Sequence, residues 1–261
     1  MYNDAHIHVG SPETIKNILK TSQYLKKYRA YSAVDLKSLD EQKEYLSTIN
    51  DFFAIPIVFK EVDIQRENSY TKDYCSNLGR GIPVTVIDNN EKFDENIPVA
   101  LMKEHFLLHT SDDYQNRSMF YEYLNDNEGF LILHCKDKVR VDYIKTLRQN
   151  FPKMNIIVAH LGRNGVENQQ EILSFLSQHK YDEKIYYDIS TVSNVETIIR
   201  ALSIIDSNKI LYGSDYPYEF RLEKELEFRK SLEERLKNDQ PLFMKLSGDN
   251  FERIKTRLRK K

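Results

Sequence analysis

Short apolar runs alternate with longer amphipathic stretches from one end of the chain to the other. Runs such as FAIPIVF, FLIL and NIIVA are continuously apolar and rich in Ile and Val. This is typical of strands that are covered on both faces, as in a parallel sheet wrapped by helices. The expected strands are residues 3–9, 30–35, 52–59, 82–88, 98–105, 130–135, 155–160, 184–190 and 209–214.

The stretches between these strands have helical periodicity. The pair Ser11-Pro12 is typical of an N-cap followed by proline at the first helical position. Residues 195–205 place their apolar side chains on one helical face, and residues 219–238 form a long, charged and periodic segment. The alternation of strands and helices predicts repeated βαβ units.

These units indicate an α/β fold, and we expect one domain over residues 1–261 that forms a single (β/α)8 TIM barrel. Such a barrel typically takes about 250 residues, and the 8 Gly and 7 Pro of this chain form no linker-like run. The strand pattern has nine members, whereas a closed barrel of this type needs eight. We therefore expect residues 82–88 to be surplus and to pair with 98–105 as an extra strand or hairpin near 82–105.

Charge and composition narrow the classes of function. The 38 Lys and Arg residues balance 40 Asp and Glu residues, for a formal net charge of −2. This balance excludes a nucleic-acid or membrane-surface binder that acts through bulk charge. No run resembles a membrane span or signal peptide, and Cys75 and Cys135 stand outside any metal-type spacing. We expect a cytoplasmic protein that acts on a small-molecule substrate, and the sequence leaves its oligomeric state open.

Candidate chemistry begins in the first expected strand. Asp4, His6 and His8 alternate there, so a period of two places all three side chains on one face, which in a barrel is the interior. Two adjacent imidazoles offer a divalent metal two nitrogen ligands. Taken alone, an H-x-H pair is weak evidence for a metal site.

Further polar residues stand at the C-terminal ends of other expected strands. His134 ends the run FLILH, His160 ends NIIVAH, and Asp215 follows KILYGS. Each therefore stands at the C-terminal end of an expected strand, the edge at which barrel enzymes build their active sites. Together with the first-strand pair, they indicate a functional cluster.

The motifs DAHIH, LILHC, IIVAHLGR and ILYGSDYP resemble, in order, those of the amidohydrolase superfamily. More narrowly they resemble the amidohydrolase-related branch, which includes aminocarboxymuconate-semialdehyde decarboxylase, γ-resorcylate decarboxylase and small lactone hydrolases. The closing LSGDNFERI also resembles that branch, so the likeness extends from Asp4 to about Ile254. As an ordered set the motifs are specific for the superfamily but not for one reaction.

The resemblance implies a role for each motif residue. His6, His8, His134 and Asp215 would be metal ligands, and His160 would stand beside the metal and handle a proton. Asp215 and His160 would be the catalytic residues. This nitrogen and oxygen ligand set favours Zn²⁺, with Mn²⁺, Fe²⁺ or Co²⁺ also compatible.

We expect a metal-dependent hydrolase that uses a metal-activated water on an amide, lactone or ester-like bond, because the chain is short compared with many decarboxylases of this branch. The alternative is a non-oxidative decarboxylase, a lyase, that acts on a small carboxylic acid at the same site. A third hypothesis is a barrel that has lost catalysis and serves in binding. Buried ionisable groups retained at the strand ends argue against this third hypothesis.

Four further residues are candidates for substrate binding: Lys103, His105, Arg163 and Tyr216. Lys103 ends the fourth barrel strand, where related proteins often carry a Lys-x-His-Pro pattern, but this chain has Phe106 in place of proline. In other branches a lysine here is carboxylated and bridges two metals, so one metal or two remains open. Also near the strand ends are Lys136 and Tyr218, and Cys135, which we interpret as a packing residue.

Overall fold

The computed structural model describes residues 2–22, 43–88, 99–105, 108, 117–134, 141–162, 169–218 and 222–259. The strands are β1 (Tyr2–Val9), β2 (Ile49–Pro56), β3 (Ile82–Pro83), β4 (Thr85–Val86), β5 (Leu101–Glu104), β6 (Phe130–Leu133), β7 (Asn155–Val158), β8 (Ile185–Asp188) and β9 (Ile210–Leu211). The α-helices are α1 (Pro12–Thr21), α3 (Lys43–Leu46), α4 (Ile64–Leu78), α5 (Ser118–Asp126), α6 (Val141–Asn150), α7 (Gln169–His179), α8 (Val195–Ile204), α9 (Leu222–Leu236), α10 (Gln240–Met244) and α11 (Asn250–Arg259). Shorter helical segments are η2 (Ala159–Gly162), η3 (Ser207–Lys209) and η4 (Lys245–Asp249). The expected strand 30–35 lies outside the described residues.

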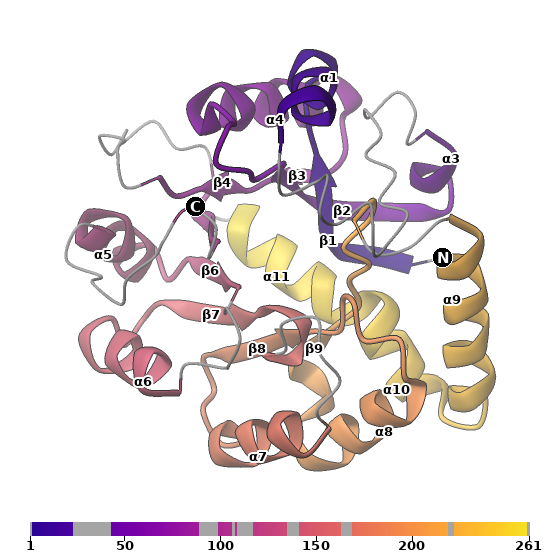
Figure 1. Cartoon of the computed structure of the whole chain (residues 1–261). Coiled ribbons are helices and arrows are strands. Elements are labelled where there is room, and N and C mark those ends of the chain that lie inside the picture. Colours follow the sequence, from indigo (N-terminus) through magenta and orange to yellow (C-terminus); the bar gives the residue numbers. More distant parts are fainter. Residues whose placement is uncertain are drawn as a thin grey trace.

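The strands form a ring with helices around it, as Figure 1 shows. Strand pairs run in the order β1-β2-β3 and β4-β5-β6-β7-β8-β9, and all of the described pairs are parallel. Only Val84 separates β3 from β4, and its amide donates to the carbonyl of Ala54 in β2 at 2.9 Å. The two short strands therefore act as one barrel strand.

Backbone hydrogen bonds also join the first strand to the last. The amide of Ala5 donates to the carbonyl of Tyr212 at 2.9 Å, and the amide of Asp215 donates to the carbonyl of His6 at 2.8 Å. The amide of His8 donates to the carbonyl of Tyr216 at 2.8 Å. These bonds bring β1 alongside the segment after β9, so the described strands form the expected (β/α)8 barrel.

The expectation of a surplus hairpin near 82–105 is wrong. Residues 82–88 do pair with the next expected strand, but β4 runs parallel to β5, with Val86 opposite Lys103. A hairpin needs antiparallel strands, whereas a parallel pair belongs to the βαβ pattern of the rest of the ring. The segment is thus the third barrel strand.

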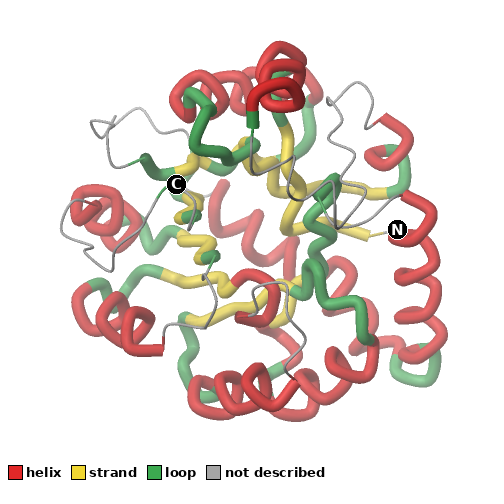
Figure 2. Tube along the Cα trace, viewed as in Figure 1, coloured by secondary structure: helices red, strands yellow, loops and turns green. Residues whose placement is uncertain are grey.

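Apolar side chains fill both faces of the ring. Inside the barrel, Phe53, Leu101, Ile132 and Ile157 pack with Phe251 of α11. On the outer side another set of strand residues packs against the surrounding helices, which explains why the strand sequences are continuously apolar. In the tube view of Figure 2, α11 is seen through the ring of strands, and the longer helices lie around that ring.

Helix α11 lies across the N-terminal ends of the strands. Asn250 donates to the carbonyl of Ile210 at 2.6 Å, and Lys255 forms an ion pair with Asp51 at 2.7 Å. The guanidinium of Arg257 lies 4.9 Å from the ring centre of Phe130. These contacts join α11 to the starts of three strands, so the C-terminal strand ends lie at the opposite end of the barrel.

The segment after β1 is held in place by a helix cap and a buried carboxylate. Ser11 caps α1 by accepting from the amide of Thr14, as its sequence predicts. Glu67 of α4 accepts from the amide and hydroxyl of Ser11 at 2.8 and 2.7 Å. This anchors the turn that follows His8. None of the helices in the described ranges is long and apolar enough to cross a membrane.

Candidate metal centre

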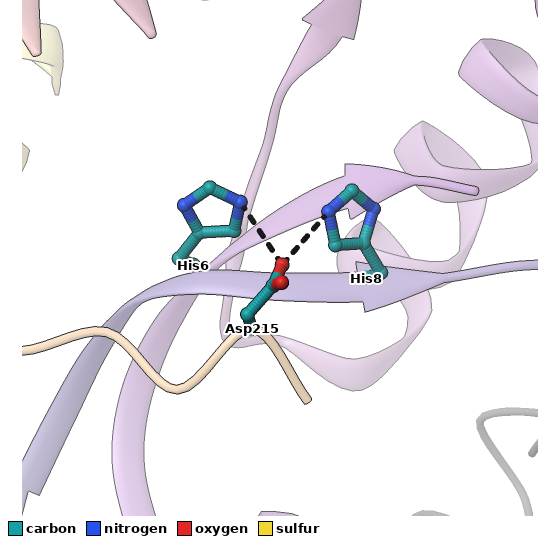
Figure 3. A group of neighbouring side chains, drawn as sticks. All are labelled: His6, His8 and Asp215. Atoms are coloured by element: carbon teal, nitrogen blue, oxygen red, sulfur yellow. Dashed lines mark ion pairs between the residues drawn. The ribbon is translucent and has the colours of Figure 1, made fainter. Parts of the chain in front are cut away.

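Three side chains from opposite ends of the sequence converge at the C-terminal end of the barrel. His6 and His8 come from β1, and Asp215 comes from the segment after β9 (Figure 3). One oxygen, Oδ1 of Asp215, lies 3.3 Å from Nε2 of His6 and 3.3 Å from Nε2 of His8. All three residues are buried, and their ligand atoms lie within 4.8 Å of one another.

Hydrogen bonds at the far side of each imidazole set which nitrogen faces this point. Nδ1 of His6 lies 2.9 Å from Oδ2 of Asp188, and Nδ1 of His8 lies 3.1 Å from the carbonyl oxygen of Pro56. Because both partners are acceptors, the ring proton belongs on Nδ1. The lone pair of each Nε2 is then directed at the common point, as in the carboxylate–histidine–metal arrangement of metal sites.

Burial controls the charge of these groups. Loss of solvent lowers the pKa of His6 and His8 well below the usual value, and the nearby Lys103 lowers both further. Burial raises the pKa of Asp215 to about 7, which the charge of Lys103 opposes. The two imidazoles are therefore neutral near pH 7, and neutral imidazole is the form that binds metal.

Lys103 stands in the middle of this group. Its Nζ lies 2.7 Å from Nε2 of His6 and 3.2 Å from Nε2 of His8, and its side chain has no solvent exposure. Burial lowers the pKa of this amine to about 8, with the charge of Asp215 acting against the shift. The residue expected to line the pocket thus contacts the nitrogens that a metal would use.

His160 and His134 extend the cluster. Nε2 of His160 lies 3.2 Å from Nδ1 of His134, and the ring centres are 4.6 Å apart. On its other side, Nδ1 of His160 lies 2.8 Å from the hydroxyl of Ser190. His160 also forms, with His6 and Asp188, a second group whose ligand atoms lie within 4.8 Å of one another. His134 therefore reaches the cluster through His160.

The backbone at His160 takes an uncommon conformation. His160 and Leu161 have φ values of 58° and 51°, in the left-handed region that disfavours side chains with a Cβ. The amide of His160 donates to Oδ1 of Asp188 at 2.9 Å. Such backbone strain is frequent where a functional group must be aimed.

The four substrate-binding candidates have different outcomes. His105 lies inside the cluster, with its ring centre 4.6 Å from that of His134, and Lys103 lies at its centre as described. Tyr216 instead stacks on Tyr45 of α3, at 4.3 Å between ring centres, and packs in the outer layer. Arg163 lies outside the described residues, together with Lys136 and Cys135.

Tyr216 points outward because β1 and the segment after β9 pair in the manner of a strand, which sends alternate side chains to opposite sides. Tyr218, two residues on, lies with its ring perpendicular to that of His8, at 4.5 Å between centres. Of the two tyrosines, Tyr218 therefore borders the site.

Asp4 also departs from the expectation. Its carboxylate accepts from the hydroxyl of Tyr45, a residue of the outer layer, and so does not share a face with His6 and His8. The register of β1 shifts on β2 between Asp4 and Ile7, and this bulge breaks the period of two.

Sequence reasoning missed Asp188, the residue that ends β8 and contacts both His6 and His160. The signal was present, because Asp188 follows the apolar run IYY just as His134 follows FLIL. A search for every polar residue at a strand end would have found it.

A family model described as amidohydrolase matches residues 4–250. The chain belongs to the amidohydrolase family. A search of curated proteins finds no significant match. The family assignment agrees with the resemblance of the strand-end motifs and covers all of the clustered residues.

Solved structures share the fold over nearly their whole length. An amidohydrolase from Burkholderia multivorans with bound zinc is 10% identical, with a TM-score of 0.71 over 97% of this chain and 98% of that one. An amidohydrolase from Bifidobacterium longum subsp. infantis is 13% identical, with a TM-score of 0.65 over 97% of both chains. A dihydroxybenzoic acid decarboxylase from Polaromonas with bound manganese is 14% identical, with a TM-score of 0.61 over 97% of both chains.

Proposed function

We propose that this amidohydrolase-family chain is a metal-dependent hydrolase that acts on an amide, lactone or ester-like bond of a small molecule. The observation that carries the proposal is the convergence of two imidazole nitrogens and one carboxylate oxygen, from His6, His8 and Asp215, at the C-terminal end of the barrel. That end is where barrel enzymes place their chemistry.

The donor set fits a divalent ion. Two neutral imidazoles and a carboxylate are suitable ligands for Zn²⁺, and the hydrogen bonds that the two imidazoles donate to Asp188 and Pro56 direct both Nε2 atoms inward. We propose His134 as a fourth ligand because it borders His160 within the same cluster. Zinc is our first candidate, and the relatives from Burkholderia and Polaromonas hold zinc and manganese respectively.

A bound ion would supply Lewis acidity and lower the pKa of water. Asp215, whose pKa burial raises to about 7, would accept a proton from the attacking water and return it to the leaving group. His160, held between the hydroxyl of Ser190 at Nδ1 and Nδ1 of His134 at Nε2, would stand beside the ion and handle a proton. Lys103, His105 and Arg163 remain our candidates for contacts with the substrate.

The first test is metal content, measured by mass spectrometry on protein purified without chelators or an affinity tag. We expect about one equivalent per chain, and we expect His6→Ala, His134→Ala and Asp215→Ala to lose metal and activity while remaining folded. His179→Ala is a matched control, because the hydrogen bond described for this buried histidine lies within α7, to the carbonyl of Phe175 at 3.0 Å. Full activity in His6→Ala, or no metal uptake on reconstitution, would contradict the proposal.

The second candidate is a metal-dependent decarboxylase of a small carboxylic acid. It is favoured by the decarboxylase among the proteins of similar fold. The metal-loaded protein should be incubated in parallel with lactones, esters and amides and with aromatic or unsaturated carboxylic acids. Release of CO₂ from the acids without cleavage of the first panel would replace the hydrolase by the lyase.

A further inference from the structure

Asp4 lies two residues before the first histidine of the cluster but faces away from it. Between Asp4 and Ile7, three residue steps of β1 span only two steps of β2, from Phe52 to Ala54. One extra residue is therefore accommodated, which is the definition of a bulge. The bulge turns Asp4 to the helix side of the barrel while Ala5 and His6 face the interior.

One oxygen of Asp4 connects the two chain segments that carry the cluster. Its Oδ1 accepts from the amide of His6 at 2.9 Å and from the amide of Ser214 at 3.1 Å. The next amide, that of Asp215, donates to the carbonyl of His6 at 2.8 Å. The backbone of His6 is thus joined to the amide of Asp215 directly and to the amide of Ser214 through Asp4.

The second oxygen of Asp4 is held from the opposite side. It accepts from the hydroxyl of Tyr45, which in turn accepts from Nη2 of Arg229 at 2.6 Å. Arg229 also donates to the hydroxyl groups of Tyr212 and Thr48, at 2.8 and 2.9 Å. The carboxylate of Asp4 is fully buried, so both of its oxygens are satisfied entirely by protein groups.

We propose that Asp4 is a positioning residue that sets the spacing between His6 and Asp215, with Tyr45 and Arg229 holding its carboxylate in place. The inference rests on the proposed metal function, because the spacing it sets is that of two proposed ligands. Groups that orient ligands without touching the ion commonly control metal affinity by about 10–100-fold. Asp4 itself contacts neither the reacting atoms nor the ion.

The test is the affinity of the full, metal-stripped chain for Zn²⁺, measured by competition with a chromogenic chelator. We expect Asp4→Ala to bind at least about tenfold more weakly than the wild type. Asp4→Asn should stay within about threefold, because its amide oxygen still accepts from the amides of His6 and Ser214. This rescue separates positioning from a requirement for negative charge.

Glu225→Gln is the matched control. Glu225 belongs to the same buried network through Arg229 and Tyr212, but it contacts neither His6 nor Ser214 in the structure. We expect this variant to keep wild-type affinity for Zn²⁺. An equal loss in Glu225→Gln and Asp4→Ala would overturn the proposal, since general loosening of the core would then suffice.

Circular dichroism checks that each variant is folded. Wild-type affinity in folded Asp4→Ala overturns the positioning role alone, whereas a wild-type chain that takes up no Zn²⁺ overturns the proposed metal function and the positioning role with it. If Asp4→Ala does not fold, Tyr45→Phe decides the matter, because it removes the donor to Asp4 without leaving a large cavity. A measurable loss of affinity supports the proposal and an unchanged affinity overturns it.

Discussion

Asp188 and His6 form a fully buried hydrogen bond, with Oδ2 of Asp188 2.9 Å from Nδ1 of His6. The carboxylate thereby determines which nitrogen of His6 faces the cluster. Oδ1 of the same residue accepts the amide of His160 at 2.9 Å. One side chain at the end of β8 therefore orients a proposed ligand and the proposed proton carrier together.

Removing Asp188 should weaken metal binding. In Asp188→Ala the ring proton of His6 is free to move to Nε2, where it would occupy the lone pair that a metal needs. The affinity for Zn²⁺ should therefore fall by about 10–100-fold. Titration of the metal-stripped protein with Zn²⁺ measures this. Asp51→Ala is the control, because Asp51 is also a buried carboxylate but pairs with Lys255 at the other end of the barrel. Equal affinities in the two variants would disprove the role of Asp188.

Replacing Lys103 should strengthen metal binding. The ammonium lies 2.7 Å from Nε2 of His6, so its charge opposes a cation at that point. In Lys103→Met, affinity for the first metal equivalent should rise by about tenfold or more. Lys209→Met, which alters a half-buried lysine at η3, should leave affinity unchanged. If the wild type holds two equivalents and Lys103→Met loses metal, the lysine is instead a carboxylated bridge.

A methyl group at Gly213 should disturb the site. A Cβ there would lie 3.0 Å from Cβ of His6 and 3.3 Å from Cβ of Ser190, tighter than ordinary contact. Gly213→Ala should therefore destabilise the fold by about 1–3 kcal/mol and reduce metal affinity. In Gly248→Ala the nearest atom would be 3.9 Å away, and stability should be unchanged or slightly higher. Urea unfolding measures the free energy of unfolding of both variants, and equal values would contradict the prediction.

Glu225 should make stability depend on pH. Burial raises its pKa to about 8, against the charge of Arg229, so folding favours the neutral form. The contribution of Glu225 to the free energy of unfolding is fully present below its unfolded pKa of about 4.3. It is lost as the pH rises toward 8, with a slope of up to about 1.4 kcal/mol per pH unit. Relative to the wild type, Glu225→Gln should gain stability over this range. A difference between the two proteins that stays constant from pH 5 to 8.5 would contradict the prediction.

The fold could be predicted because its main determinant is local. Strands such as Phe130–Leu133 and Asn155–Val158 are apolar on both sides, and this pattern alone indicates a covered parallel sheet. The rule that barrel enzymes build their sites at the C-terminal ends of the strands then predicted that His134, His160 and Asp215 lie at one end of the barrel. What failed was the assignment of 82–88 as a hairpin, since pairing direction depends on partners distant in sequence.

Details of the site depend on register and therefore escaped prediction. A bulge of one residue turned Asp4 outward, and alternation beyond β9 turned Tyr216 toward Tyr45. The bulge leaves no signal in composition or spacing, whereas the outward direction of Tyr216 agrees with its place directly after Asp215 in a strand-like segment. The central place of Lys103 likewise follows from the match of β5 to its neighbours in the ring, which the sequence of β5 does not contain.

Helix α11 gives the barrel the form of a cup. Its Phe251 packs on Phe53 inside the ring, and its polar side chains bind the starts of the strands. Helix α11 therefore covers the end of the barrel away from the histidines. We therefore expect a substrate to approach His8, and a product to leave, from the C-terminal ends of the strands. Substitutions in the loops at the C-terminal ends of the strands can change which molecules bind, while the packing of α11 and the stability that it provides stay unchanged.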